Sequence, residues 1–217
     1  MMISGEEVKT STESQSTPHG WGARSNHIAF DPEYAEGARN AVNVCLRVQA
    51  NEKVCVITDE ATLEIAAAVV SELDRLGAPY RVWVLEDLAE RPLKDLPAEI
   101  LADLETSQVS IFAVWAQRNE LRSRMQMTDV VNRNKIRHAH MVNINRQIML
   151  EGMRADFQKV DRLSAKVVAM VRKAKRVRAK TAAGTDLIAD LNPNYHWLKT
   201  SGIISAEKWG NLPGGEI

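Results

Sequence analysis

The chain has few cysteines, no surplus of either charge and no long apolar run. Its 217 residues include only Cys45 and Cys55, which form no CxxC pair, so the sequence offers no disulfide framework. Free thiols are typical of reducing compartments, which predicts a cytoplasmic protein. No stretch approaches the ~20 apolar residues of a membrane helix, and the N-terminus lacks the apolar region of a signal peptide.

The balance of charge narrows the choice of partners. The sequence has 28 Lys and Arg residues and 28 Asp and Glu residues, so its formal net charge is zero. General binders of nucleic acid or membrane surfaces need a basic excess. The run Arg172–Lys180 is locally basic and could contact RNA or an anionic substrate. We favour the interpretation that this run is a solvated helix end followed by the solvent-exposed face of a strand. We therefore predict neither a nucleic-acid nor a membrane partner.

Four short apolar runs alternate with helical patterns. The predicted strands are Val54–Thr58, Tyr80–Leu85, Val109–Val114 and Ile136–Met141. Amphipathic helices are expected at about 34–48, 59–76, 97–105, 119–131 and 156–174, and the second of these can be capped by Asp59 and ended by Gly77. Runs that are apolar throughout suit strands buried on both faces, and strands that alternate with helices favour a parallel sheet. The sequence therefore predicts an α/β protein with a mostly parallel, doubly wound, Rossmann-like sheet.

Changes in composition divide the chain into three parts. Residues 1–25 are rich in Ser, Thr, Glu and Gly and are expected to form a disordered or loosely attached tail. Residues 26–175 form the predicted α/β domain. After residue 175, two short strands at 176–181 and 186–191 flank a turn at Ala183–Thr185, which predicts a β-hairpin. We interpret 176–217 as the beginning of a second domain.

Several familiar kinds of site are missing from the sequence. The first strand-to-helix turn, Thr58–Thr62, has no glycine and carries two carboxylates, so it is poorly suited to a pyrophosphate. No Walker A string, Gly-x-Ser-x-Gly elbow or H-E-x-x-H zinc helix occurs. Cys45 and Cys55 lie on predicted apolar faces and are interpreted as packing residues. These features argue against a nucleotide cofactor and against a serine or cysteine nucleophile.

His138 and His140 lie in the fourth predicted strand, with Ala139 between them. A period of two places both imidazoles on one face of the sheet, where they could bind a metal or move protons. At the carboxyl end of a parallel strand they would border the usual ligand crevice. We favour core or sheet-end histidines bonded to loop carbonyls, because no third ligand lies nearby in the sequence.

The last residues form a turn that carries one carboxylate. Asn211-Leu212-Pro213-Gly214-Gly215 precedes Glu216, and the chain has one further residue, Ile217. Proline restricts the backbone and glycine allows close approach, so this turn could aim the Glu216 carboxylate inward. A bridging carboxylate is a normal ligand in two-metal hydrolase sites. Glu216 is therefore the candidate metal ligand.

The segment Asn211–Glu216 resembles the signature that carries the first metal-ligand glutamate of the aminopeptidase T family of metallo-aminopeptidases. Further segments resemble the N-terminal domain of these leucyl aminopeptidase-like proteins, and together they cover most of 35–216. They are Gly37–Asn40, Val56–Asp59, Glu86–Leu88, Arg91–Leu93, Arg137–Met141, Glu151–Asp156 and Gly184–Leu187. The segments most specific to the family are Gly184–Leu187 and Asn211–Glu216. The order and spacing of all these segments carry the resemblance.

The resemblance implies a dimeric, two-domain enzyme that uses zinc or cobalt to release N-terminal amino acids from peptides. Only the family's first metal-ligand glutamate maps here, onto Glu216, and the later Glu, His and Asp ligands have no counterpart. We therefore expect an N-terminal half, cut at its first metal ligand and inactive alone. Two alternatives stay open: a relative of iron-dependent dihydroxypyridine ring-cleaving dioxygenases, and a truncated, non-catalytic α/β interaction domain.

Overall fold

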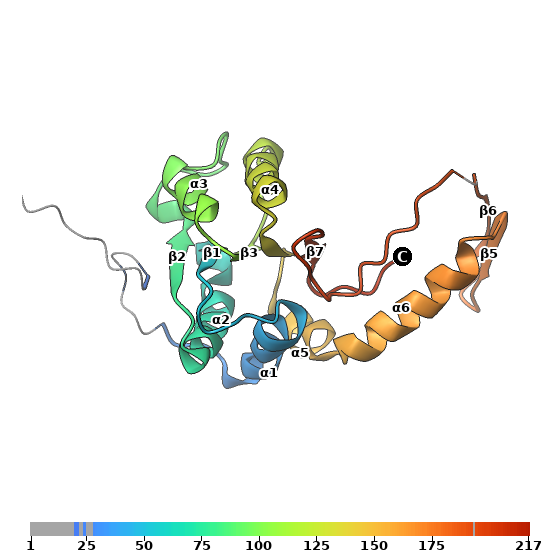
Figure 1. The fold of residues 1–217 in the computed structure, drawn as a ribbon, viewed down its shortest axis with the longest axis horizontal. Coiled ribbons are helices and arrows are strands. Elements are labelled where there is room, and N and C mark those ends of the chain that lie inside the picture. The colour runs from blue at the N-terminus through green and yellow to red at the C-terminus, as the bar shows by residue number, and fades with distance from the viewer. Residues whose placement is uncertain (1–19, 22–23, 25–27, 193) are drawn as a thin grey trace, which may run out of the picture.

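The protein is a parallel α/β sheet with helices on both faces, from which one helix and a hairpin extend (Figure 1). The computed structural model describes residues 20–21, 24, 28–192 and 194–217. The sheet has the strand order β2-β1-β3-β4-β7, and every neighbouring pair is parallel. Its strands are β1 (Val54–Thr58), β2 (Tyr80–Val84), β3 (Val109–Val114), β4 (Arg137–Val142) and β7 (Gly210–Asn211). The predicted α/β class and the four predicted strands are confirmed.

Helices cover both faces of the sheet and enclose two apolar cores. One face packs on α1 (Ala35–Arg39), the π-helical turn Asn40–Cys45, α2 (Leu63–Leu76) and α5 (Arg146–Leu150). The other face packs on α3 (Ala98–Glu105) and α4 (Leu121–Asn134). Short 3₁₀ turns occupy Pro32–Tyr34, Glu60–Thr62, Leu85–Asp87 and Gly152–Arg154. Successive residues of a strand point into opposite cores, which explains why the strands are apolar throughout.

Local signals set the ends of the best-defined helix, α2. The Asp59 side chain accepts a hydrogen bond from the Thr62 amide at 3.0 Å, so it caps the turn that leads into α2, as predicted. Gly77 ends α2 with φ of 73°, a left-handed conformation that glycine adopts without steric cost. These two residues fix where the first crossover begins and ends.

The C-terminal third departs from the regular alternation. Helix α6 (Phe157–Val171) extends away from the sheet, and the hairpin of β5 (Arg176–Lys180) and β6 (Asp186–Asp190) lies near its far end (Figure 1). The hairpin is antiparallel, as predicted. The chain then returns, and β7 adds a fifth strand beside β4, which the sequence did not predict. The C-terminal turn is thereby brought against the α/β sheet.

Most of the expected N-terminal tail, 1–25, lies outside the described residues. Of the part that is described, Gly20 forms a bridge with Arg81, and the Trp21 side chain is buried. The Val82 amide donates to the Gly20 carbonyl at 3.1 Å. Among the described residues, no helix has both the length and the apolar character required to cross a membrane.

Candidate functional site

The turn that carries Glu216 is anchored by the sheet. Asn211 lies opposite His140 in the β4–β7 pair, and the Leu212 amide donates to the His140 carbonyl at 3.1 Å. The Leu212 side chain is buried. Two consecutive residues before Pro213 therefore hold the turn in register with the main sheet.

Close backbone contacts fix the rest of this turn. A Cβ atom on Gly214 would lie 2.4 Å from the Gly202 nitrogen and 2.8 Å from the Thr200 carbonyl oxygen, so only glycine fits there. The Gly215 amide donates to the Thr200 carbonyl at 2.7 Å, and the Thr200 amide donates to the Glu216 carbonyl at 3.0 Å. The backbone of Glu216 is thus held on both sides.

The Glu216 side chain is exposed, and among the described residues its carboxylate has no hydrogen bond or ion pair. No group of three or more His, Cys, Asp or Glu side chains within the described part of the chain is arranged to hold a metal ion. A hydrolytic metal usually needs about three protein ligands and an open position. The described residues therefore offer one well-placed carboxylate and do not fit a complete metal site.

Of the two histidines of β4, His138 is fully buried and His140 is partly buried. Both project from the face of the sheet that packs on α3 and α4, and they occupy the second and fourth positions of the strand. His138 Nδ1 lies 2.8 Å from the Ser110 hydroxyl, and its Nε2 lies 3.1 Å from His140 Nδ1. The His140 ring stacks on Phe112, and Trp209 packs against both imidazoles. They do not border the carboxyl-end crevice, and their partners are side chains rather than loop carbonyls.

Burial keeps both imidazoles neutral at pH 7. It lowers the pKa of His138 well below the ordinary value of 6.5, and the neighbouring His140 lowers it further. Burial also lowers the pKa of His140 to about 4, and the charge of Arg124 adds to this effect. Two neutral rings, one buried and one partly buried, with hydroxyl and aromatic neighbours are suited to packing the β3–β4–β7 region.

Lowering the pH from 7 to 4.5 is expected to destabilise the fold through His140. An unfolded histidine has its pKa near 6.5 and folded His140 near 4, so the unfolded chain takes up the proton first. Stability is therefore lost as the pH falls below about 6.5, by about 2 kcal/mol at pH 4.5. Urea unfolding at both pH values should show a smaller loss in His140→Gln and an unchanged loss in the exposed-residue control His196→Gln. An equal loss in H140Q and wild type would contradict the assignment.

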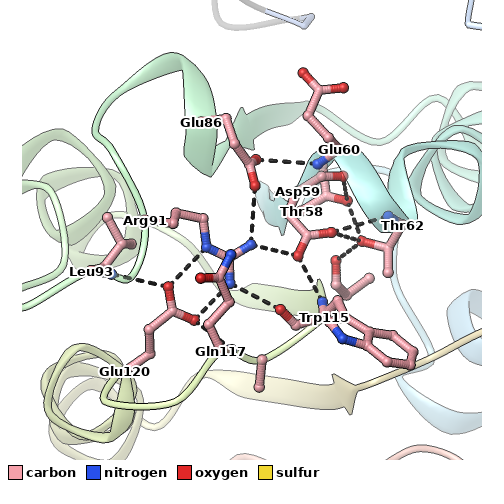
Figure 2. Close-up of polar contacts among 12 residues, drawn as sticks. Thr58, Asp59, Glu60, Thr62, Glu86, Arg91, Leu93, Trp115, Gln117 and Glu120 are labelled. Atoms are coloured by element: carbon pink, nitrogen blue, oxygen red, sulfur yellow. Dashed lines mark hydrogen bonds and ion pairs between the residues drawn. The ribbon is translucent and has the colours of Figure 1, made fainter.

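The carboxyl ends of β1, β2 and β3 meet at a buried ion-pair network centred on Arg91 (Figure 2). The Arg91 side chain is only 4% exposed, and all five of its N–H donors are used. Two reach Glu120, at 2.8 and 2.6 Å, and one reaches Asp59 at 2.6 Å. The remaining two reach Glu86, at 3.1 Å, and the Trp115 carbonyl, at 2.9 Å.

The carboxylates of this network are also tied to backbone amides. Asp59 accepts from the Trp115 amide at 2.7 Å, and Glu120 accepts from the amides of Leu93 and Gln117, each at 3.0 Å. Burial alone would raise the pKa of Glu120, but Arg91 and these amides lower it to about 2. The network joins the loops after three strands, and Asp59 and Arg91 contact each other directly at 2.6 Å.

Sequence reasoning did not identify the Arg91 network. It assigned Asp59 only as a helix cap, and it did not single out Glu120. A weak signal was present, since Asp59 and Arg91 belong to two segments that carry the family resemblance. Asp59 and Glu120 lie 32 and 29 positions from Arg91 in the sequence. No local pattern links residues so far apart, so these ion pairs are a property of the folded sheet.

The remaining candidate residues have structural surroundings. Cys45 and Cys55 are buried and free, and burial raises the pKa of the Cys45 thiol to about 12 and that of Cys55 well above its usual value. In the basic run, Arg176 pairs with Asp190 and Arg178 pairs with Asp186 across the hairpin. Both thiols thus pack in the core, and part of the basic run is neutralised by acids on the facing strand.

Comparison with known proteins shows that this chain shares its fold with two solved structures. No protein-family profile and no curated protein matches the sequence. Among solved structures, AmpT from Thermus thermophilus, an aminopeptidase T, is similar with a TM-score of 0.56 and 14% identity, over 86% of this chain and 60% of that one. The 2,5-dihydroxypyridine dioxygenase from Pseudomonas putida KT2440 is similar with a TM-score of 0.54 and 13% identity, over 84% of this chain and 54% of that one.

These likenesses agree with the resemblance in the sequence at the level of the fold. The chain spans 60% of the length of one protein and 54% of the other. Both carry names of enzymes with different reactions, so the shared architecture does not select a reaction. The chain has an α/β fold like that of AmpT and of the dihydroxypyridine dioxygenase.

Proposed function

We propose that this chain is the N-terminal part of a divalent-metal-dependent aminopeptidase and that Glu216 is its first metal ligand. The observation that carries the proposal is the docked turn at Asn211–Glu216, which fixes the backbone of Glu216 and leaves its carboxylate without a partner among the described residues. The backbone of a ligand held this way has little conformational freedom left to lose when the side chain binds an ion. The turn matches the family signature, and the fold around it is similar to that of AmpT.

In this proposal, the remaining metal ligands come from residues outside these 217. Zinc or cobalt would be held by Glu216 together with further Glu, His and Asp side chains, and the bound metal would activate water for attack on a peptide bond. The substrate is the N-terminal end of a peptide, and the enzyme acts as a homodimer. Its two free, buried thiols suit a cytoplasmic location.

The similarity to the dihydroxypyridine dioxygenase favours a second candidate function. Its TM-score of 0.54 nearly equals the 0.56 for AmpT, so a ring-cleaving enzyme that uses iron has comparable support from the fold. Assays of the longer polypeptide with peptides and with 2,5-dihydroxypyridine separate the two. A third candidate, a non-catalytic interaction domain, would show neither activity and no metal bound through Glu216.

The 217-residue chain alone is expected to hydrolyse no peptide, with or without added zinc or cobalt. One free carboxylate cannot supply the approximately three ligands that a hydrolytic metal usually needs. The measurement is the release of N-terminal amino acids from unblocked peptides by the purified chain, with the metal-supplemented longer polypeptide as the positive control. Metal-dependent release by the short chain would move the active site away from Glu216.

A further inference from the structure

A crevice lies at the carboxyl end of the sheet, on the other side of Trp115 from Arg91. The chain leaves β1 toward β2 on one side and leaves β3 toward β4 on the other side, so the loops that follow β1 and β3 diverge. Ligands of open α/β sheets bind at such a point. A cavity of about 340 Å³ opens here, and its lining includes Tyr34, Glu60, Glu64, Trp115, Asn145 and Arg146. This volume is in the range of small-molecule sites.

The Trp115 indole is the apolar wall of this crevice. Trp115 is 49% exposed, although its backbone N–H and C=O are hydrogen-bonded to the side chains of Asp59 and Arg91. Figure 2 shows the indole pointing away from Arg91. An indole that is fixed at its backbone and half-exposed offers a rigid face to an apolar group or a cation at little entropic cost.

The crevice is lined by acidic side chains, and one of them has no cationic partner among the described residues. Glu60 pairs with Arg24, and Arg146 pairs with Asp31 and Glu33. Glu64, in the first turn of α2, has no ion pair or hydrogen bond among the described residues. Burial raises the pKa of the Tyr34 phenol, and the charge of Glu64 raises it further, so the phenol stays neutral. Among the described residues, Glu64 is therefore the carboxylate of the crevice without a cationic partner.

We propose that this crevice binds a small organic ammonium compound, with the cation attracted to Glu64 and its apolar body packed on the Trp115 indole. An anionic ligand is disfavoured, because the guanidinium of Arg146 is already bridged by two carboxylates. A cavity lined by a carboxylate and an exposed aromatic face has the chemistry that recognises amines. The crevice shares no residue with the Glu216 turn, so this site is independent of the proposed metal.

The test uses the 217-residue chain without metal and 2-phenylethylammonium as the probe. Titration is followed by the indole N–H resonances of the five tryptophans in ¹⁵N-labelled protein, and Trp115→Ala assigns the Trp115 signal. We expect a saturable shift of the Trp115 resonance at millimolar probe and a much smaller one with the uncharged analogue 2-phenylethanol. Binding measured by calorimetry should weaken about tenfold in Trp115→Ala.

A matched pair of variants tests the role of charge. Glu64→Gln should weaken probe binding about three- to fivefold, the loss that corresponds to one exposed ion pair. Glu99→Gln removes a glutamate from the same position in the first turn of α3 and should leave the affinity unchanged. Equal binding of the alcohol, equal affinity of E64Q and E99Q, or no saturable Trp115 shift up to about 10 mM probe would each overturn the proposal. None of these outcomes depends on metal or peptidase activity.

Discussion

Glu216→Gln in the longer polypeptide is expected to remove nearly all peptidase activity and most of the bound metal. Glutamine keeps the size of the side chain and the docked backbone but loses the charge that a divalent ion requires. Loss of a partner that only orients a metal ligand typically costs 10–100-fold, so we expect the ligand itself to cost at least about 100-fold in kcat/KM. Metal content by elemental mass spectrometry and peptide turnover are the two measurements.

Glu207→Gln is the matched control for this substitution. Glu207 is an exposed glutamate nine residues earlier on the same returning segment, and no hydrogen bond or ion pair involves it among the described residues. Its variant should keep the wild-type metal content and turnover. Normal metal content and activity in E216Q would remove Glu216 from the site and with it the main reason for proposing an aminopeptidase.

Arg91→Met is expected to cost about 3–5 kcal/mol of unfolding free energy, the largest stability effect of any single change considered. The substitution leaves Asp59 and Glu120 buried without their partner, and an uncompensated buried charge is strongly destabilising. Small domains have about 5–15 kcal/mol in total, so the variant should be close to unfolding. Urea denaturation at pH 7 measures the loss.

A control and a change of pH separate this effect from a general loss of charge. Arg122→Met breaks the exposed ion pair with Asp95, whose partners are 74% and 53% exposed, and should change stability by less than about 1 kcal/mol. In R91M, Glu120 stays buried without Arg91, so its pKa is expected to rise and the folded state should take up a proton more readily than the unfolded chain as the pH falls. The deficit of R91M should therefore shrink between pH 7 and 5, and a constant deficit would contradict the buried-charge explanation.

Much of the fold could be predicted from local sequence, because buried parallel strands and their helices leave local patterns. The apolar run Val54–Thr58 is buried at every position, as a strand between two helical layers must be. Asp59 and Gly77 signalled the start and the end of the first crossover through capping chemistry that involves only neighbouring residues. The hairpin of β5 and β6 was visible for the same reason.

The histidines show where local pattern reasoning stops. The period of two placed His138 and His140 on one face of the sheet, which is what the structure has. The pattern could not tell how far along the strand they lie, or that Trp209 from the returning segment would cover both rings. Their depressed pKa values follow from this burial and not from the strand itself.

By itself, the sequence determined the α/β class, the four main strands and the turn that carries Glu216, since each depends on residues within a few positions of one another. Only the tertiary structure decided that Gly210–Asn211 joins β4 and that Arg91 gathers Asp59, Glu86 and Glu120. It also decided that Trp115 faces an acidic crevice. These features join segments far apart in the chain, and a contact between such segments forms only when the packing of the whole sheet brings them together.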